Sequence, residues 1–556
     1  MTSYGPGSIL ESIRGPRLIP RIERSGLFHQ EAPTLYEIFE PALSQVLPER
    51  GRIFRLPSNA ERECDDSRAI YETLNFPRWS LCARHGILYR LQYGERKGCV
   101  KCPAWTNKEQ AWERAREQAV SFVMACPEGH LSDVPWSAML HAGAARNCRP
   151  AYIEWSGAGG PLRGVRLRCP DCAATQDLAA MYHRNHHCQG RFLEKGSRDD
   201  PGTDCKASAR ICQRAASDLF LPEVMSALTL PRADSALHRA LRNDTVMMGL
   251  SFLFANIAEP TEEHWQQILG QKALAQHLKS TLEQATLSDR NSIAREVLAE
   301  TEPENEEDNR RVEFSMLRRA ALEGLPRSDD FQMDAQSSQV FPLGSTRLRV
   351  TPANRLRMVM AQTGYRRLGG SPVDTAFRHG GNHWYPGVEL FGEGIFLNLE
   401  GSIPVSESDA WQTWWKRFED SGQPADHPMM IWWHTLSHRL IRALAVDSGY
   451  SAASVRERLY LHEGQGGVLL YAVQPGGDGT LGGLIALVPK FASVIAGALR
   501  HLDGCSNDPI CGEQSSGNGQ NGAACYACTL LSETACEMRN LSLDRRILVE
   551  TLELGH

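Results

Sequence analysis

Paired cysteines and histidines are the residues of this chain whose types and spacing could do chemistry. Zinc binds four nitrogen or sulfur ligands in a tetrahedron, and a sequence supplies these most simply as two close pairs, each on a tight turn. Of the 16 cysteines, eleven lie between Cys64 and Cys212 and five between Cys505 and Cys536. The 292 residues between these two blocks contain none. The sequence therefore predicts two separate metal-binding regions.

The first block opens with the strongest pattern. Cys82-x2-His85 is followed thirteen residues later by Cys99-x2-Cys102, which predicts one structural zinc site. A looser set of two cysteines and two histidines comes next, formed by Cys126, His130, His141 and Cys148. The alternative for His141 is an ordinary surface histidine.

A second knuckle of the same block is Cys169-x2-Cys172, for which Cys188 and Cys205 are the nearest partners. The stretch MYHRNHHC offers substitute ligands, namely His183, His186 and His187. Cys64 and Cys212 stand alone and are interpreted as ordinary thiols.

The last block is anchored by Cys525-x2-Cys528, with Cys511 as third ligand and either Cys536 or Cys505 as fourth. All the predicted sets have four protein ligands and no open position, which is typical of sites that stabilise a fold rather than activate water. We therefore expect three or four Zn²⁺ per chain.

A glycine-rich stretch, QPGGDGTLGGL at 474–484, is the one motif that suggests an enzyme. Backbone N–H groups of such a turn can hold phosphates, and Asp478 would then serve nucleotide or metal chemistry. The alternative is a crowded turn, in which Gly476, Gly477 and Gly479 supply backbone freedom and the last two glycines allow close helix packing. We favour the turn, because too little chain follows to complete a nucleotide-binding fold.

Other catalytic patterns are missing from the sequence. It contains no G-x-x-x-x-G-K-[ST], no G-x-S-x-G and no H-E-x-x-H, which argues against a helicase motor, a serine hydrolase of that kind and a zinc protease. His434 and His438 lie one helical turn apart, but no third ligand or acid is adjacent in sequence. We expect this pair to pack or hydrogen-bond between a helix and a sheet, near Trp432 and Trp433.

The spacing of apolar residues predicts the helices and strands that must position these side chains. Residues 236–257 and 262–285 repeat apolar residues at three- and four-residue steps and predict helices, and 300–311 predicts a solvated loop and helix start. Residues 324–352 resemble a linker or a set of loops. Further on, strands are predicted at 394–399 and 467–473, a long helix over 432–449, and a second helix over 484–504 with Pro489 inside it.

These patterns predict an α+β or α/β multidomain protein with zinc-ribbon-like N-terminal modules, a helical middle and a C-terminal α/β domain that ends in a cysteine cluster. The expected divisions are an N-terminal docking segment, a zinc-binding region, a mostly helical region with a linker, and the α/β domain, at 1–75, 76–230, 231–380 and 381–556. The net charge of −6 argues against a surface that is basic all over. No stretch of 18 apolar residues and no secretory leader is recognised, so we expect a cytoplasmic location, where thiols stay reduced.

Three C-terminal stretches carry a resemblance: HTLSHRLIRALAVDSGYSAASVRERLY, GGVLLYAVQPGGDGTLGGL and the run from Cys505 through GAACYACTLLSETACEMRNLSLDR. They are similar to a zinc-cluster domain found at the C-terminus of certain DNA helicases. Together with SYGPGSIL and CPEGHLSDVPW, they resemble the DrmB family, the helicase-partner subunits of the bacterial DISARM anti-phage system. The segment CQGRFLEKG departs from the family pattern, which has an aromatic-proline stretch after the glycine.

The resemblance implies a non-catalytic, zinc-binding subunit that pairs with a DrmA-like DNA helicase and helps the complex to bind phage DNA. On the family's cysteine pattern fall Cys505, Cys511, Cys525, Cys528 and Cys536. Two other functions stay open on the sequence alone. One is a nucleotide-binding enzyme that uses the GGDGT turn, and the other is a stand-alone zinc-dependent nucleic-acid-binding protein.

Overall fold

The computed structural model describes most of the chain. The described residues are 5–12, 15–24, 33–64, 71–90, 99–102, 119–142, 148–157, 161–195, 202–231, 236–241, 243–257, 259–270, 274, 276–299, 305–325, 328–421, 427–462, 464–475, 482–513 and 521–553. Within these ranges, no helix combines the length and the apolar character that a bilayer crossing requires.

The chain divides into two compact units that interleave along the sequence. Unit 1 comprises Met1–Phe39, Leu47–Ser226 and Met360–Val388, and unit 2 comprises Glu40–Val46, Ala227–Val359 and Glu389–His556. These limits do not follow the predicted divisions at residues 75, 230 and 380. After residues 226, 359 and 388 the chain crosses between the units within a strand, and local sequence patterns do not mark such a crossing as a domain boundary.

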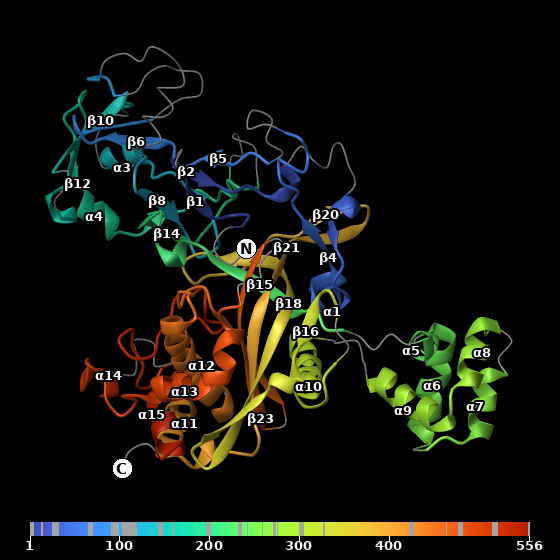
Figure 1. Ribbon diagram of the computed structural model, residues 1–556. Helices are drawn as coiled ribbons and strands as arrows, with labels where there is room; N and C mark the ends of the chain where they lie inside the picture. The colour runs from blue at the N-terminus through green and yellow to red at the C-terminus, as the bar shows by residue number, and fades with distance from the viewer. Residues whose placement is uncertain are drawn as a thin grey trace. The chain divides into compact units, whose positions relative to one another are not determined.

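Unit 1 is built from short antiparallel strands (Figure 1). Its three small sheets have the orders β1-β2-β5, β12-β11-β10-β7-β6 and β13-β14-β8-β9. Their strands are β1 (Ile9–Ser12), β2 (Gly15–Leu18), β5 (Leu74–Asn75), β6 (Trp79–Cys82), β7 (Ile87–Arg90), β8 (Phe122–Ala125), β9 (Leu131–Ser132), β10 (Tyr152–Ser156), β11 (Arg166–Arg168), β12 (Thr175–Asp177), β13 (His186–His187) and β14 (Ser208–Gln213). The unit also contains β3 (Glu37–Ile38), β4 (Arg52–Arg55), α3 (Trp136–Leu140), α4 (Leu178–Tyr182), β19 (Val373–Asp374) and β20 (Phe377–His379).

The alternation of buried and exposed side chains explains why such short segments form strands. In β6 and β10, buried residues alternate with more exposed ones, as period-2 side chains on a half-buried sheet must. The inward residues join a core in which Trp136 is fully buried and packs edge-on against Trp155, with ring centroids 5.9 Å apart. Because each sheet is small, the thiol-bearing turns between strands lie close to this core.

A helical group in unit 2 confirms the predicted helices of the middle region. It contains α5 (Ala236–Leu241), α6 (Asp244–Asn256), α7 (Glu262–Leu269), α8 (Gln276–Gln284) and α9 (Leu287–Ala299). Thr261 and His264 form a capping box at the start of α7, and Trp265 is buried in the centre of the group. The predicted helix start after residue 300 is also confirmed, since Asn305 caps α10 (Glu306–Glu323).

The predicted linker at 324–352 is instead part of a sheet. It contains β16 (Phe331–Met333), β17 (Gln339–Leu343) and the first residues of β18 (Thr346–Arg366). Gly344, at φ 56°, turns the chain between Leu343 and Thr346, which pair with each other. The glycine and serine therefore mark a tight hairpin and not a linker.

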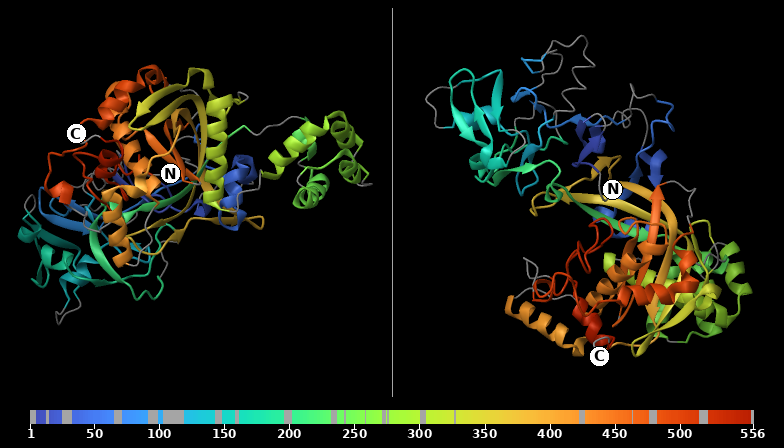
Figure 2. Two further views of the ribbon diagram at one scale, coloured as in Figure 1. Left: turned by 90° about the horizontal axis from the view of Figure 1, so that it is seen from below. Right: turned by 60° about the vertical axis from the view of Figure 1, so that its left-hand side comes forward.

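The remaining elements of unit 2 form a layered α/β structure. The strands β21 (Asn382–Leu399), β22 (Arg456–His462) and β23 (Gln465–Pro475) lie in the order β21-β23-β22, with antiparallel pairing. Figures 1 and 2 show α10 on one side of this sheet and α12 (Pro428–Asp447) on the other. The other elements are α1 (Pro41–Val46), α11 (Asp409–Ser421), α13 (Phe491–Leu499), α14 (Ile510–Glu513), α15 (Arg545–Thr551) and β15 (Leu221–Leu228), which runs from unit 1 into unit 2.

The predicted second helix over 484–504 is shorter and begins differently. Residues Ile485–Lys490 form a 3-10 turn that contains Pro489, and the α-helix starts only at Phe491. Proline lacks the N–H that an α-helix interior needs, which explains why the helix begins after it. The long helix predicted over 432–449 is confirmed, although it starts at Pro428 and ends at Asp447.

Candidate metal centres

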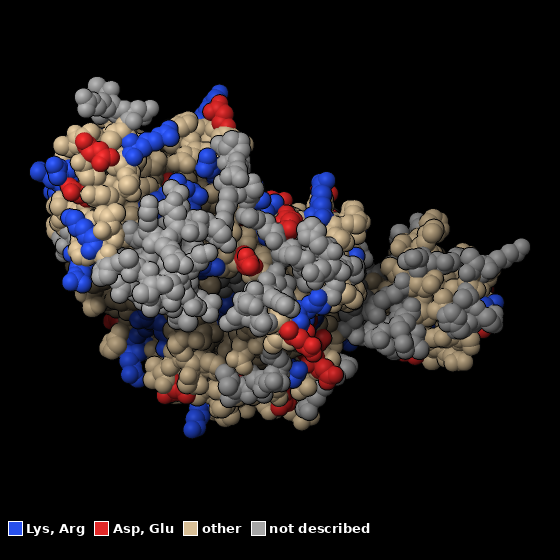
Figure 3. Space-filling view, turned by 90° about the horizontal axis from the view of Figure 1, so that it is seen from above, with Lys and Arg blue, Asp and Glu red and all other residues tan. Residues whose placement is uncertain are grey.

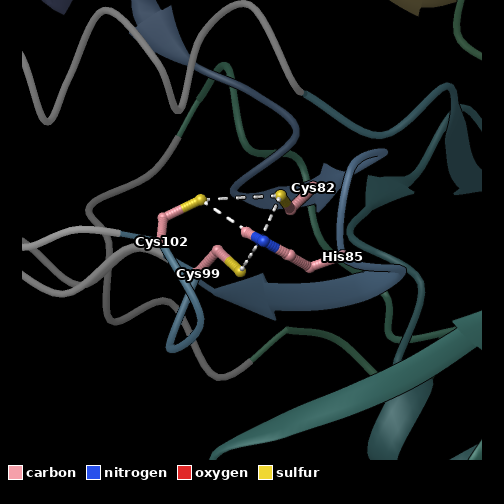
Figure 4. Close-up of side chains that lie close together, drawn as sticks. All are labelled: Cys82, His85, Cys99 and Cys102. Carbon is pink, nitrogen blue, oxygen red and sulfur yellow. Dashed lines mark hydrogen bonds between the residues drawn. The ribbon is translucent and has the colours of Figure 1, made fainter.

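Three groups of possible metal ligands lie in unit 1, and the first matches the predicted set. Cys82 ends β6, and the turn into β7 brings His85 back, with the His85 N–H donating to the Cys82 carbonyl at 3.2 Å. Figure 4 shows the Nδ1 atom of His85 between the sulfurs, 3.5 Å from Cys82, 3.4 Å from Cys99 and 3.4 Å from Cys102.

The next two groups combine the predicted ligands differently. Cys126 and His130 lie with Cys188 and Cys205, while His141 and Cys148 lie with Cys169 and Cys172. The predicted sets had paired neighbours along the chain, namely Cys126, His130, His141 and Cys148 in one and Cys169, Cys172, Cys188 and Cys205 in the other. The physical reason for the exchange is strand pairing: β14 pairs with β8 and β13, so Cys205 and Cys188 come to the turn that carries Cys126.

His141 is held in the tautomer that a metal ligand requires. Its Nδ1 atom donates to the Ser137 carbonyl at 2.6 Å, which leaves the lone pair on Nε2, and this buried atom has no hydrogen-bond partner among the described residues. His183, His186 and His187, the alternative ligands of the sequence, lie outside every group in the described part of the chain.

The C-terminal group in unit 2 contains Cys505, Cys511, Cys525 and Cys528. Three of its sulfur pairs lie 3.6, 3.7 and 3.8 Å apart. Of the two candidates for the fourth position, Cys505 is the one that lies here. Cys536 is in another group, with His434, His438 and Glu457.

The histidine pair was predicted to pack without a third ligand, and this interpretation is wrong in one respect. Glu457 from β22 and Cys536 from the loop after Cys528 approach both imidazoles, although neither is near them in sequence. The pair does lie between α12 and the sheet, as expected.

The separations fit tetrahedral coordination of zinc. A tetrahedron with Zn–S bonds of about 2.3 Å has sulfur atoms about 3.8 Å apart, and mixed N and S ligands lie about 3.5 Å apart. The sulfur–sulfur distances in the first and C-terminal groups, 3.6 to 3.8 Å, agree with this geometry. The four Cys/His groups therefore fit Zn²⁺, as the sequence predicts.

The turns also favour thiolate at the first cysteine of a pair. Burial raises the pKa of a thiol, but the N–H groups of Cys172 and Asp171 and the neighbouring His141 lower that of Cys169 to about 7. In the same way, burial of Cys525 is outweighed by the N–H groups of Cys528 and Ala527, and its pKa falls to about 7. A thiolate is the form that binds metal.

Cys64 and Cys212, interpreted from the sequence as ordinary thiols, lie outside all the groups formed by described residues.

The glycine-rich stretch at 474–484 is described only in part. Residues 476–481, which include Asp478 and the whole GGDGT motif, lie outside the described residues. The last glycine of the stretch is described: a Cβ on Gly483 would lie 2.3 Å from the Ser448 carbonyl, so glycine is needed there for close packing against the end of α12.

The segment CQGRFLEKG, where the sequence departs from the family pattern, lines the second group. The Phe192 ring packs on His130, with centroids 4.3 Å apart, and Lys195 Nζ lies 3.8 Å from the centroid of the same ring. An aromatic residue therefore still covers this group.

Comparison with known proteins confirms the resemblance. Residues 1–221 match a family described as a domain of unknown function (DUF8724), and residues 436–529 match the MrfA Zn-binding domain. The chain is similar to DISARM protein DrmB of Bacillus paralicheniformis, with 26% identity over 498 residues, 82% of this chain and 84% of that protein.

A solved structure also aligns in part, the crystal structure of the DUF1998 helicase MrfA bound to DNA. The alignment covers 32% of this chain and 21% of that chain, with 11% identity and a TM-score of 0.18. The chain thus spans about a fifth of the helicase's length.

Proposed function

We propose that this chain is a non-catalytic, zinc-binding subunit of a DISARM-type anti-phage system, which docks on a DrmA-like DNA helicase and helps the complex to hold phage DNA. The observation that carries the proposal is the similarity to DISARM protein DrmB, which extends over 82% of this chain and 84% of that protein.

The metal groups support a scaffold and not a catalyst. Each of the four Cys/His groups supplies four ligand atoms from the protein, which leaves no position for a reacting water. Zinc in closed sites cross-links short strands and turns and makes their surfaces rigid. Rigid surfaces suit docking, and thiolate ligands suit the reducing cytoplasm that we propose as the location.

The surface charge gives little support to a stand-alone DNA-binding protein. On the coloured part of the face in Figure 3, Lys and Arg lie singly or in small groups, with Asp and Glu among them. Many exposed arginines are also paired with acids, such as Arg166 with Asp177 and Arg168 with Glu154. Non-specific DNA binding depends on unneutralised Lys and Arg that replace counterions on phosphates.

Co-expression with a DrmA-like DNA helicase tests the proposal. We expect one stable complex by size exclusion at micromolar concentration, and an unrelated helicase serves as the control. Separate migration of the two proteins would contradict the proposal.

DNA binding by the same preparations separates the proposal from its rival. We expect the complex to bind DNA more tightly than this chain alone. Tight, salt-sensitive binding by the isolated chain would favour a stand-alone nucleic-acid-binding protein instead.

A further inference from the structure

A fifth group of metal-binding side chains lies in the interior of unit 2, between α12, β22 and the loop after the C-terminal cysteine knuckle. His434 and His438 come from one face of α12, Glu457 from β22 and Cys536 from the loop. Their exposed fractions are 0, 0, 1 and 8%. Their ligand atoms all lie within 4.8 Å of one another.

Both imidazoles present a lone pair to the same point. His434 Nδ1 lies 3.3 Å from the Ser542 carbonyl and His438 Nδ1 lies 3.1 Å from the Thr529 carbonyl, so each Nδ1 carries the proton that is donated there. In a neutral imidazole the other nitrogen is then an acceptor. The two Nε2 atoms lie 3.1 and 3.4 Å from Glu457 Oε1, which is itself an acceptor.

Glu457 and Cys536 are likewise held in place by hydrogen bonds from neighbouring groups. Glu457 accepts hydrogen bonds from the Ser437 hydroxyl at Oε2 and from the Glu537 N–H at Oε1, the latter at 3.3 Å. Cys536 Sγ accepts from the Asn540 N–H at 3.1 Å and lies 3.1 Å from His434 Nε2. Donors therefore surround the group, and acceptors face one another at its centre.

With both imidazoles neutral and Cys536 ionised to the thiolate that binds metal, four acceptors face one another in a buried site, and a cation at the centre offsets the repulsion between them. An unpaired buried polar atom costs about 1–3 kcal/mol. His438 Nε2 has no hydrogen-bond partner among the described residues. Oriented histidines with hydrogen-bonded Nδ1 atoms are the usual second shell of a bound metal.

We propose that His434, His438, Glu457 and Cys536 bind a further Zn²⁺, in addition to the four Cys/His sites. Two neutral imidazoles, one carboxylate and one thiolate neutralise a divalent cation. Bonds of about 2.0–2.1 Å to nitrogen and oxygen place tetrahedral ligands about 3.3 Å apart, close to the 3.1 and 3.4 Å between the imidazoles and Glu457. The site is closed and buried, so its zinc holds α12, β22 and the C-terminal loop together.

Zinc-edge anomalous diffraction from crystals of the unaltered full-length protein tests the proposal directly. We expect a peak at the centre of these four side chains, comparable in height with the peak at the four-cysteine site of Cys505, Cys511, Cys525 and Cys528 in the same molecule. A peak at that four-cysteine site and none here would overturn the proposal.

A variant provides a second readout. Cys536→Ser should lower the zinc content of the purified chain by one per molecule, as measured by mass spectrometry of the metal. Cys212→Ser is the matched control, because Cys212 is also a buried cysteine but lies outside every group of described residues. Equal zinc content in the two variants would contradict the proposal, and the diffraction measurement decides if Cys536→Ser does not fold. Neither test depends on the helicase partner.

Discussion

The residues that hold unit 2 together include charges that are buried completely. Glu313 on α10 accepts from Arg458 Nε at 2.6 Å and from the Tyr460 hydroxyl at 3.1 Å, and Arg458 is fully buried. Arg458 and Tyr460 thus reach α10, whereas Glu457, the residue before Arg458, reaches the histidines of α12. The strand β22 therefore contributes Arg458 to an ion pair with α10 and Glu457 to the proposed zinc site with α12.

We predict that Glu313→Ala destabilises the protein by about 3–5 kcal/mol, because the buried Arg458 would lose the carboxylate that accepts two of its hydrogen bonds. Arg319→Ala is the control on the same helix, since its ion pair with Glu323 is largely exposed and worth about 1 kcal/mol or less. Urea unfolding of both variants measures the difference. Similar midpoints for the two would show that the buried pair contributes little.

The tautomer of His141 leads to a second prediction. His141→Ala should remove one zinc per chain, because its Nε2 atom completes the group with Cys148, Cys169 and Cys172. His183→Ala, an exposed histidine in the stretch that offered substitute ligands, should leave the zinc content unchanged. Loss of metal from the His183 variant instead would mean that the ligand set is different.

At the scale of elements, Gly392 of β21 allows the close approach of β23. A Cβ on Gly392 would lie 1.9 Å from the Ala472 carbonyl oxygen of β23. Because the obstacle is backbone, the strands must move apart to admit a side chain.

We expect Gly392→Ala to destabilise unit 2 by about 1–3 kcal/mol, the usual cost of overpacking. Gly504→Ala is the control, since a Cβ there meets nothing within 4 Å. Thermal unfolding followed by circular dichroism compares them, and an unchanged midpoint for Gly392→Ala would contradict the packing described here.

The sequence predicts those features whose signal lies within a few neighbouring residues. The knuckle Cys525-x2-Cys528 is one such feature, and α12 is another, because its apolar residues recur at helical spacing. The exchange of Cys188 and Cys205 for His141 and Cys148 depends on the pairing of β14 with both β8 and β13, which local patterns do not contain. For the same reason Glu457 was not recognised as a partner of His434 and His438, since it reaches them from a strand position 19 residues beyond His438.

At the scale of the whole molecule, we expect bound zinc to contribute a large part of the free energy of unfolding of unit 1. Its sheets are small, and three of the Cys/His groups lie in their turns. We predict that a strong chelator lowers the melting temperature of the full chain and that Zn²⁺ restores it, while Mg²⁺, which prefers oxygen ligands, does not. Complete loss of zinc with an unchanged melting temperature would contradict this prediction.

The nucleotide hypothesis is also tested on the whole chain. We expect millimolar ATP or NAD to leave the melting temperature unchanged, because the glycine-rich stretch is interpreted as a packing turn. A rise that Asp478→Ala abolishes would favour a nucleotide-binding enzyme.

Closed zinc sites hold the short strands and turns of this protein together, and the metal content of the unaltered, full-length chain tests whether they are present. Purified without chelator and measured by mass spectrometry of the metal, the protein should contain at least four zinc ions per chain, one for each Cys/His group. A content of one or none would contradict the account.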